Sequence, residues 1–152
     1  MTNNKIVLLY NRITEMLKNL NDILLFAIRI VLAYGFYITA SMKWQNIGGV
    51  AEWFGELGIP FPTINAYLAA TTEAAGVVLL VLGLATRVIS IPLIITMMVA
   101  IVSVHWQNGF EAGNNGFEIP LYYLLFLFAL LIKSSGKYSL DYLLKKKLNS
   151  HK

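Results

Sequence analysis

Four apolar segments constrain this sequence more than any other feature. They cover residues 23–42, 64–84, 88–104 and 118–132. A helix needs roughly 17–25 mostly apolar residues to cross the hydrocarbon core of a bilayer. The fourth segment is shorter than this and needs extra turns. The pattern therefore predicts an all-α integral membrane protein, a four-transmembrane-helix bundle embedded in the lipid bilayer.

The overall composition supports a membrane protein. Of the 152 residues, 57% are hydrophobic and 13% are charged, against about 45–50% and about 25% in soluble domains. A soluble domain of this size has too small a core to bury so much apolar surface. The absence of cysteine excludes disulfides, thiolate metal sites and thiol nucleophiles. The net charge of +4 does not indicate a nucleic-acid partner, because most Lys and Arg lie near the chain ends.

The distribution of charge predicts the orientation in the membrane. Both tails and the short turn at residues 85–87 are basic, whereas the connections at residues 43–63 and 105–117 carry most of the acidic residues between the segments. Basic loops remain on the cytoplasmic side of a membrane. We expect a multi-pass protein of a bacterial-type inner (plasma) membrane with both termini in the cytoplasm.

Two further segments are amphipathic, with apolar residues recurring at helical spacing. Residues 1–22 predict a helix on the cytoplasmic face, with a partner-binding coiled coil as the alternative. Residues 47–57 predict a short outer interfacial helix. The chain then divides into the amphipathic helix, a membrane domain over residues 23–133 and a basic cytoplasmic tail over residues 134–152.

Arg29 and Glu73 lie inside the predicted spans, and Lys43 follows the outer end of the first span. A charge at the centre of a membrane helix costs about 2.5–3.5 kcal/mol on insertion scales, so these side chains should face the bundle. They predict either a cluster that binds a ligand or relays protons, or a structural ion pair that fixes helix register. The position along the helices favours Lys43 as the partner of Glu73. Small residues at four-residue spacing, including Ala66 and Ala70, predict that the same span is central in the bundle.

His105 ends the third segment and is a further candidate. Histidine and methionine are ligands of Cu(I), so His105, Met98 and Met42 are candidate copper ligands. However, His105 and Met98 are seven residues apart, about 10 Å along a helix, and cannot share one ion by helix geometry alone. The other interpretation is an interfacial histidine hydrogen-bonded to a loop.

Two more charged residues are candidates for ligand binding or for structure. Arg87 is either a topology anchor at the membrane surface or a site residue. Glu118 follows Asn115 by three positions, which predicts a capping box at the fourth span. Its carboxylate would otherwise line the outer pocket.

The order of several short motifs resembles the DoxX family of small four-helix membrane proteins. The motif residues are Arg29, Gly35, Lys43, Gly58 to Pro62, Glu73 with Gly76, Gly83 to Arg87, and Gly136 to Asp141. The resemblance implies a link to membrane redox functions, such as a quinone-reducing subunit, and polar positions at Arg29, Lys43, Glu73 and Arg87. Residues 105–109 resemble the HvfX-like branch, which accompanies the maturation of copper-binding peptides.

Three functions remain open from the sequence. The first is a redox-linked, quinone-interacting subunit that works with partner proteins, and any enzymatic activity would be that of a membrane oxidoreductase subunit. Its pocket would hold Lys43 and Glu73 with nearby Tyr34, Tyr37 and Trp44. The second is a non-enzymatic membrane component of copper-binding peptide maturation or export. The third is a small transporter, which would need a homo-oligomer to form a path.

Overall fold

The computed structural model describes residues 2–150, and every regular element in that range is helical. The α-helices are α1 (Thr2–Gln45), α2 (Ile47–Glu56), α3 (Pro62–Leu82), α4 (Thr86–Ala100), α5 (Glu118–Lys133) and α6 (Leu140–Asn149). A π-helical turn, η1 (Ile101–His105), continues α4, and the short 3-10 turns η2 (Trp106–Asn108) and η3 (Ala112–Asn114) precede α5.

The four predicted spans correspond to α1, α3, α4 with η1, and α5. Three helical stretches are long and apolar enough to cross a membrane: Lys5–Gln45, Pro62–Leu82 and Thr86–Asn108. The prediction of an all-α membrane protein is therefore confirmed. α5 has 16 residues, or about 24 Å of helix, so a crossing by this helix remains a prediction.

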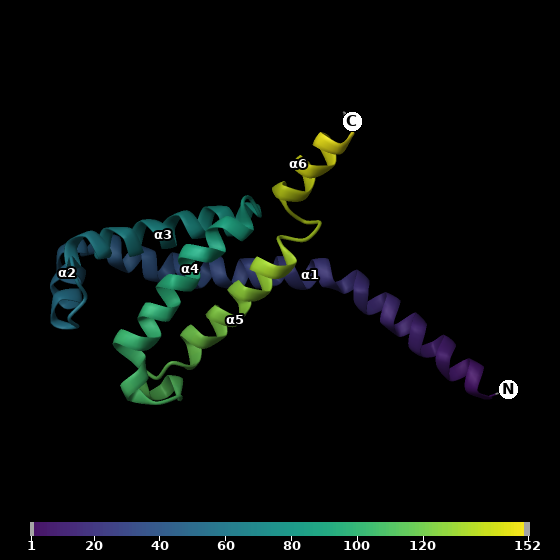
Figure 1. Ribbon diagram of the computed structural model, residues 1–152, viewed down its shortest axis with the longest axis horizontal. Helices are drawn as coiled ribbons and strands as arrows, with labels where there is room; N and C mark the ends of the chain where they lie inside the picture. Colours follow the sequence, from purple (N-terminus) through teal and green to yellow (C-terminus); the bar gives the residue numbers. More distant parts are fainter. Residues whose placement is uncertain (1, 151–152) are drawn as a thin grey trace.

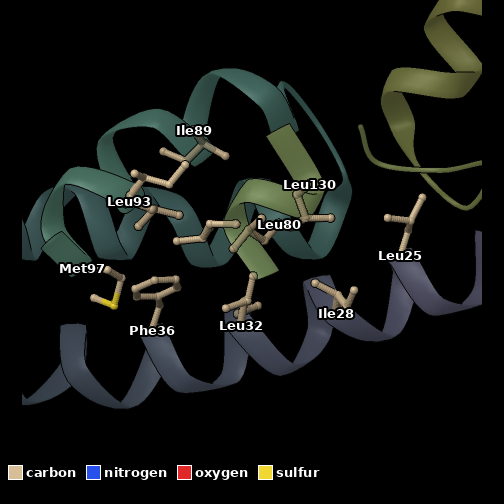
Figure 2. Packing of buried hydrophobic residues seen from close by; sticks show 12 residues of the cluster. Leu25, Ile28, Leu32, Phe36, Leu80, Ile89, Leu93, Met97 and Leu130 are labelled. Carbon is tan, nitrogen blue, oxygen red and sulfur yellow. The ribbon is translucent and has the colours of Figure 1, made fainter. Parts of the chain in front are cut away.

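The helices pack into one bundle whose outer surface is apolar. α1 runs along α3, α4 runs along α5, and α3 also contacts α4 (Figure 1). Figure 2 shows Leu32 and Phe36 of α1 pointing toward Leu80 of α3 and Leu93 of α4. Large apolar side chains also cover the outside of the bundle, for example Val88 at 68% exposure. A lipid environment explains this surface.

Small residues bring α3 close to its neighbours, as expected. Ala66 and Ala70 are fully buried on α3. A Cβ atom placed on Gly76 would approach the side chain of Leu93 to 2.9 Å, so glycine permits the close contact between α3 and α4. α3 packs against α1, α2 and α4, and a central place for it in a four-helix bundle remains a prediction.

The amphipathic segment and the first span form one continuous helix. α1 passes residue 22 without a break, and its N-terminal part projects away from the bundle (Figure 1). The apolar residues of this part, including Ile6, Leu9 and Leu17, are exposed. The second amphipathic segment forms α2, which packs against α3.

Candidate functional site

A cavity of about 920 Å³ lies in the half of the bundle next to α2. We call it the α2-end cavity. Residues from α1, α2, α3, α4, η1, α5 and the connecting loops contribute to its wall. The polar side chains that line it include Lys43, Thr72, Glu73, Thr96 and His105. The cavity therefore combines a largely apolar wall with a few polar groups, as small-molecule sites do.

An ion pair between α1 and α3 forms part of this wall. Lys43 Nζ lies 2.8 Å from Glu73 Oε2 and 3.0 Å from Glu73 Oε1. The Glu73 side chain is 2% exposed, whereas that of Lys43 is 18% exposed. The expectation that Glu73 pairs with Lys43 is thus confirmed geometrically.

The facing surfaces of α1 and α3 position this pair. Phe36, Ala40 and Lys43 follow one another at three- and four-residue spacing on α1, and Phe36 and Ala40 are buried. Ala66, Ala70 and Glu73 have the same spacing on α3. Residues at this spacing share one face of a helix. The alanines bring the two helices close enough for Lys43 to reach Glu73.

The aromatic residues at the cavity differ from those expected. Tyr34, Tyr37 and Trp44 are exposed and do not line it. The lining aromatics are instead Phe36, Trp53, Phe54 and Tyr123. The reason is helical phase, since residues 34 and 37 fall outside the buried stripe of α1 that contains Phe36. Phe36 and Tyr123 pack edge to face with ring centroids 5.5 Å apart, a favoured geometry for aromatic pairs.

His105 lies in the cavity wall and also contacts the loop before α5. Its Nδ1 is 2.7 Å from the carbonyl oxygen of Asn115, which agrees with the interpretation as a loop-bonded histidine. It ends a π-helical turn, a feature often found at functional sites. Met42 and Met98 are exposed and do not line the cavity. Within the described residues, no three His, Asp or Glu gather as a metal site, and copper binding remains an untested expectation.

The capping box predicted for Glu118 is wrong. The N-cap of α5 is Phe117, without a side-chain hydrogen bond, and Asn115 adopts a left-handed conformation with φ 59°. The loop turns back on itself here, because Phe117 N donates to Gly109 O at 3.0 Å. Glu118 instead accepts hydrogen bonds from Ala112 N at 3.0 Å and from the Tyr122 hydroxyl at 2.9 Å. It stabilises the loop and is not part of the cavity wall.

Arg29 lies at the other end of the bundle, roughly 21 Å along α1 from Lys43. It is fully buried. Its guanidinium donates to Leu80 O at 3.0 Å, to Val81 O at 3.4 Å and to Tyr138 O, while its Nε has no hydrogen-bond partner among the described residues. The last carbonyls of a helix lack partners within the helix. Arg29 thus caps α3 and does not join the Lys43 and Glu73 pair.

Asp141 completes this end of the bundle; from the sequence it was named only as the last residue of a family motif, without a role. Its carboxylate accepts hydrogen bonds from Ala85 N at 2.8 Å and from Thr86 N at 3.1 Å, at the start of α4. Its own N–H donates to Gly83 O at 3.0 Å. A carboxylate at a helix N-terminus is favourable.

Arg87, the last candidate, donates to Ile132 O at 3.0 Å at the end of α5, and it does not line the α2-end cavity.

Known proteins resemble this chain over most of its length. A protein from Haemophilus influenzae, described as uncharacterized, is 34% identical over 130 residues, covering 80% of this chain and 83% of its own. "Putative oxidoreductase CatD" from Bacillus subtilis is 31% identical, covering 72% and 76%. "Inner membrane protein YphA" from Escherichia coli is 29% identical, covering 61% and 69%.

No solved structure matches the chain significantly. The DoxX family matches residues 24–106, a range that includes the buried stripe of α1, all of α3 and the π-helical turn. The match therefore covers Arg29, Lys43, Glu73, Arg87 and His105. This protein belongs to the DoxX family of membrane proteins.

Proposed function

We propose that the protein is a quinone-interacting component of a membrane redox system and that it works with partner proteins. The observation that carries this proposal is the α2-end cavity with the Lys43 and Glu73 ion pair in its wall. The relative from Bacillus subtilis, which is named as an oxidoreductase, supports a redox role.

The cavity borders the surface that faces lipid. Leu68 of α3 and Ile95 and Val99 of α4 line it, and all three side chains are also exposed. Figure 1 shows α3 and α4 diverging from the turn that joins them toward the end of the bundle at α2. Because these three side chains belong both to the cavity wall and to the exposed apolar surface, a compound dissolved in the bilayer can reach the cavity from that side. This route favours a lipid-soluble ligand over a water-soluble one.

The residues in the wall fit a quinone. Its carbonyl oxygens need hydrogen-bond donors, and its flat ring packs well against aromatic side chains. Lys43 supplies a donor, while Phe36, Trp53 and Tyr123 supply aromatic surface. The volume of about 920 Å³ lies within the range of roughly 300–1,000 Å³ of small-molecule sites and leaves space for part of an isoprenoid tail. When bound, a quinone supplies two-electron redox chemistry coupled to proton uptake.

The ion pair can bind the head group and handle protons. A lysine ammonium has three N–H donors, and the two Glu73 oxygens accept from two of them. The third is free to donate to a ligand in the cavity. Glu73, held in a buried position by Lys43, is placed to accept or return a proton. Electrons would come from a partner redox protein.

Quinone binding by the purified protein tests this proposal. Trp53 lies in the cavity wall, so a short-chain quinone should quench tryptophan fluorescence in a saturable manner. Lys43→Gln should weaken binding about 10- to 100-fold, because a hydrogen bond to a charged group contributes about 1.5–3 kcal/mol. Glu73→Gln should change the affinity as well, since it removes the negative charge that holds the Lys43 ammonium in place.

Glu52→Gln is the matched control, because Glu52 is exposed on α2 and does not line the cavity. It should bind quinone as the unaltered protein does. A wild-type protein that shows no saturable quenching, or Lys43→Gln with unchanged affinity, would contradict the proposal.

We also propose an inner-membrane location with both termini in the cytoplasm. The basic tails support this orientation through the positive-inside rule. The name of the relative from Escherichia coli supports the location.

A further inference from the structure

A second cavity lies at the opposite end of the bundle from the Lys43 and Glu73 pair. It has a volume of about 440 Å³. Its lining residues are Thr14, Leu17, Lys18 and Asn21 of α1 and Lys133 at the end of α5. We propose that this basic cavity binds the phosphate headgroup of an anionic phospholipid. The proposal is independent of quinone binding at the α2-end cavity.

The charges in the basic cavity have the same sign. Two lysines line it and no carboxylate does. Among the side chains that the structure describes, the ion pairs are Lys43 with Glu73 and Lys137 with Asp22, so neither Lys18 nor Lys133 takes part in one. Two ammonium groups beside one cavity repel each other. An anion between them would remove this repulsion.

The neighbouring carboxylate is already engaged. Asp22 follows the lining residue Asn21 on α1, and its Oδ2 lies 3.2 Å from Lys137 Nζ. Its Oδ1 also accepts a hydrogen bond from Lys137 N at 3.0 Å. Both oxygens of Asp22 are thus directed to the segment that follows α5. Asp22 is therefore not the counter-ion of Lys18 or Lys133, and an anion from outside the chain can take that place.

The apolar part of the basic cavity favours a lipid over a free anion. Leu17 lines it and is 60% exposed. The buried stripe of α1 begins at Leu25, so the basic cavity lies just beyond the packed core. Figure 1 shows the N-terminal part of α1 leaving the bundle near the end of α5. A phospholipid that lies between the N-terminal part of α1 and the end of α5 would place its phosphate at the two lysines and its acyl chains against the apolar face of α1.

Basic recesses between helices at a membrane surface are known to take anionic headgroups. The amide of Asn21 adds a hydrogen-bond donor to the two ammonium groups. This donor set suits phosphate oxygens. Phosphatidylglycerol, which carries one negative charge, is therefore the probe for an experiment.

The test is native mass spectrometry of the full chain in a neutral detergent. The detergent micelles contain phosphatidylglycerol or phosphatidylcholine with the same acyl chains, or the solution contains inorganic phosphate. Lys18→Gln/Lys133→Gln is the test variant. Lys145→Gln/Lys146→Gln removes the same charge from α6, outside the basic cavity, and is the control.

Phosphatidylglycerol should bind the unaltered protein and the control alike, and phosphatidylcholine should bind both much more weakly. Each lysine near an anionic headgroup should contribute about fivefold in affinity, so the test variant should bind on the order of 25-fold more weakly. Both lysines are exposed, so folding should persist, and circular dichroism checks it. Should the double variant unfold, Lys18→Gln and Lys133→Gln alone are each expected to show the fivefold loss.

Three results would overturn the proposal. An equal loss in the control would mean that net charge, and not the basic cavity, attracts the lipid. Equal binding of phosphatidylcholine would mean that the headgroup charge is not recognised. Inorganic phosphate that binds as tightly as phosphatidylglycerol, and displaces it, would identify a site for a free anion.

Discussion

Removing the Lys43 and Glu73 ion pair one residue at a time should have unequal effects on stability. Lys43→Met leaves the Glu73 carboxylate without its counter-ion at 2% exposure. Breaking a buried pair in this way costs about 3–5 kcal/mol in the free energy of unfolding.

Glu73→Leu should be less harmful than Lys43→Met. The remaining ammonium is 18% exposed and lines the α2-end cavity, so it can turn toward water there. The loss should be about 1.5–3 kcal/mol, the contribution of a hydrogen bond to a charged group. The double variant Lys43→Met/Glu73→Leu should lie within about 1 kcal/mol of the unaltered protein, because apolar residues often replace a buried pair without loss.

The assay is reversible unfolding in mixed micelles, followed by helix content, for the four proteins of this cycle. Losses that add up, or a double variant less stable than either single one, would refute the argument that the two charges depend on each other. The same four proteins are then titrated with the short-chain quinone.

The combination of stability and binding separates the two interpretations of the pair. A double variant with normal stability and at least tenfold weaker quinone binding shows that the pair acts on the ligand. A double variant that binds quinone normally shows that Lys43 and Glu73 only fix the register of α1 and α3.

The conservative variant Glu73→Gln adds a readout in cells. It should fail to complement a deletion strain while its abundance in the membrane stays normal.

Other features of the structure lead to simpler tests. Asp141→Ala should lower the free energy of unfolding by about 1–2 kcal/mol, because the first N–H groups of α4 lose their cap. Gly35→Ala should destabilise by about 1–3 kcal/mol, since a Cβ there overlaps the Tyr123 hydroxyl, and Tyr123→Phe should restore part of that loss in a thermal melt. A reporter fused after Lys152 should be active only if it works in the cytoplasm, and activity of a periplasm-dependent reporter would contradict the proposed topology. Deletion of residues 2–18 should leave membrane yield intact, because the apolar stretch that follows is long enough to span by itself; loss of inserted protein on a membrane blot would contradict this.

The helices could be predicted because their signal lies within each segment. A run of apolar residues defines a membrane helix without reference to the rest of the chain. The partner of Glu73 was also predictable, since counting residues from the helix ends places Lys43 at a similar depth. The prediction that Tyr34, Tyr37 and Trp44 line the cavity was wrong. These residues were chosen because they are near Lys43 in the sequence, without regard to the face of the helix on which they lie. The helical phase of α1, with Leu32, Phe36 and Ala40 in one buried stripe, would have identified Phe36.

The interactions of the loops could not be predicted in this way. The capping box at Glu118 failed because residues 109 and 117 pair across the loop, which no spacing pattern shows. Asp141 caps a helix that begins 55 residues earlier in the chain. Such a contact depends on how α6 returns to the turn between α3 and α4, and only the three-dimensional structure gives this.

The positions of the charged residues along the helices place Arg29 and the Lys43 and Glu73 pair in different surroundings. Arg29 lies where α3 ends, and the unpaired carbonyls of a helix terminus accept its hydrogen bonds. Lys43 meets Glu73 in the interior of α3, where the backbone carbonyls are already bonded within the helix. There each charge has the other as its counter-ion. A buried ion pair adds little net stability, because the cost of removing both charges from water offsets their attraction. Apolar residues would serve the packing of α1 and α3 equally well, so the reason for the pair should be sought in the cavity that it lines.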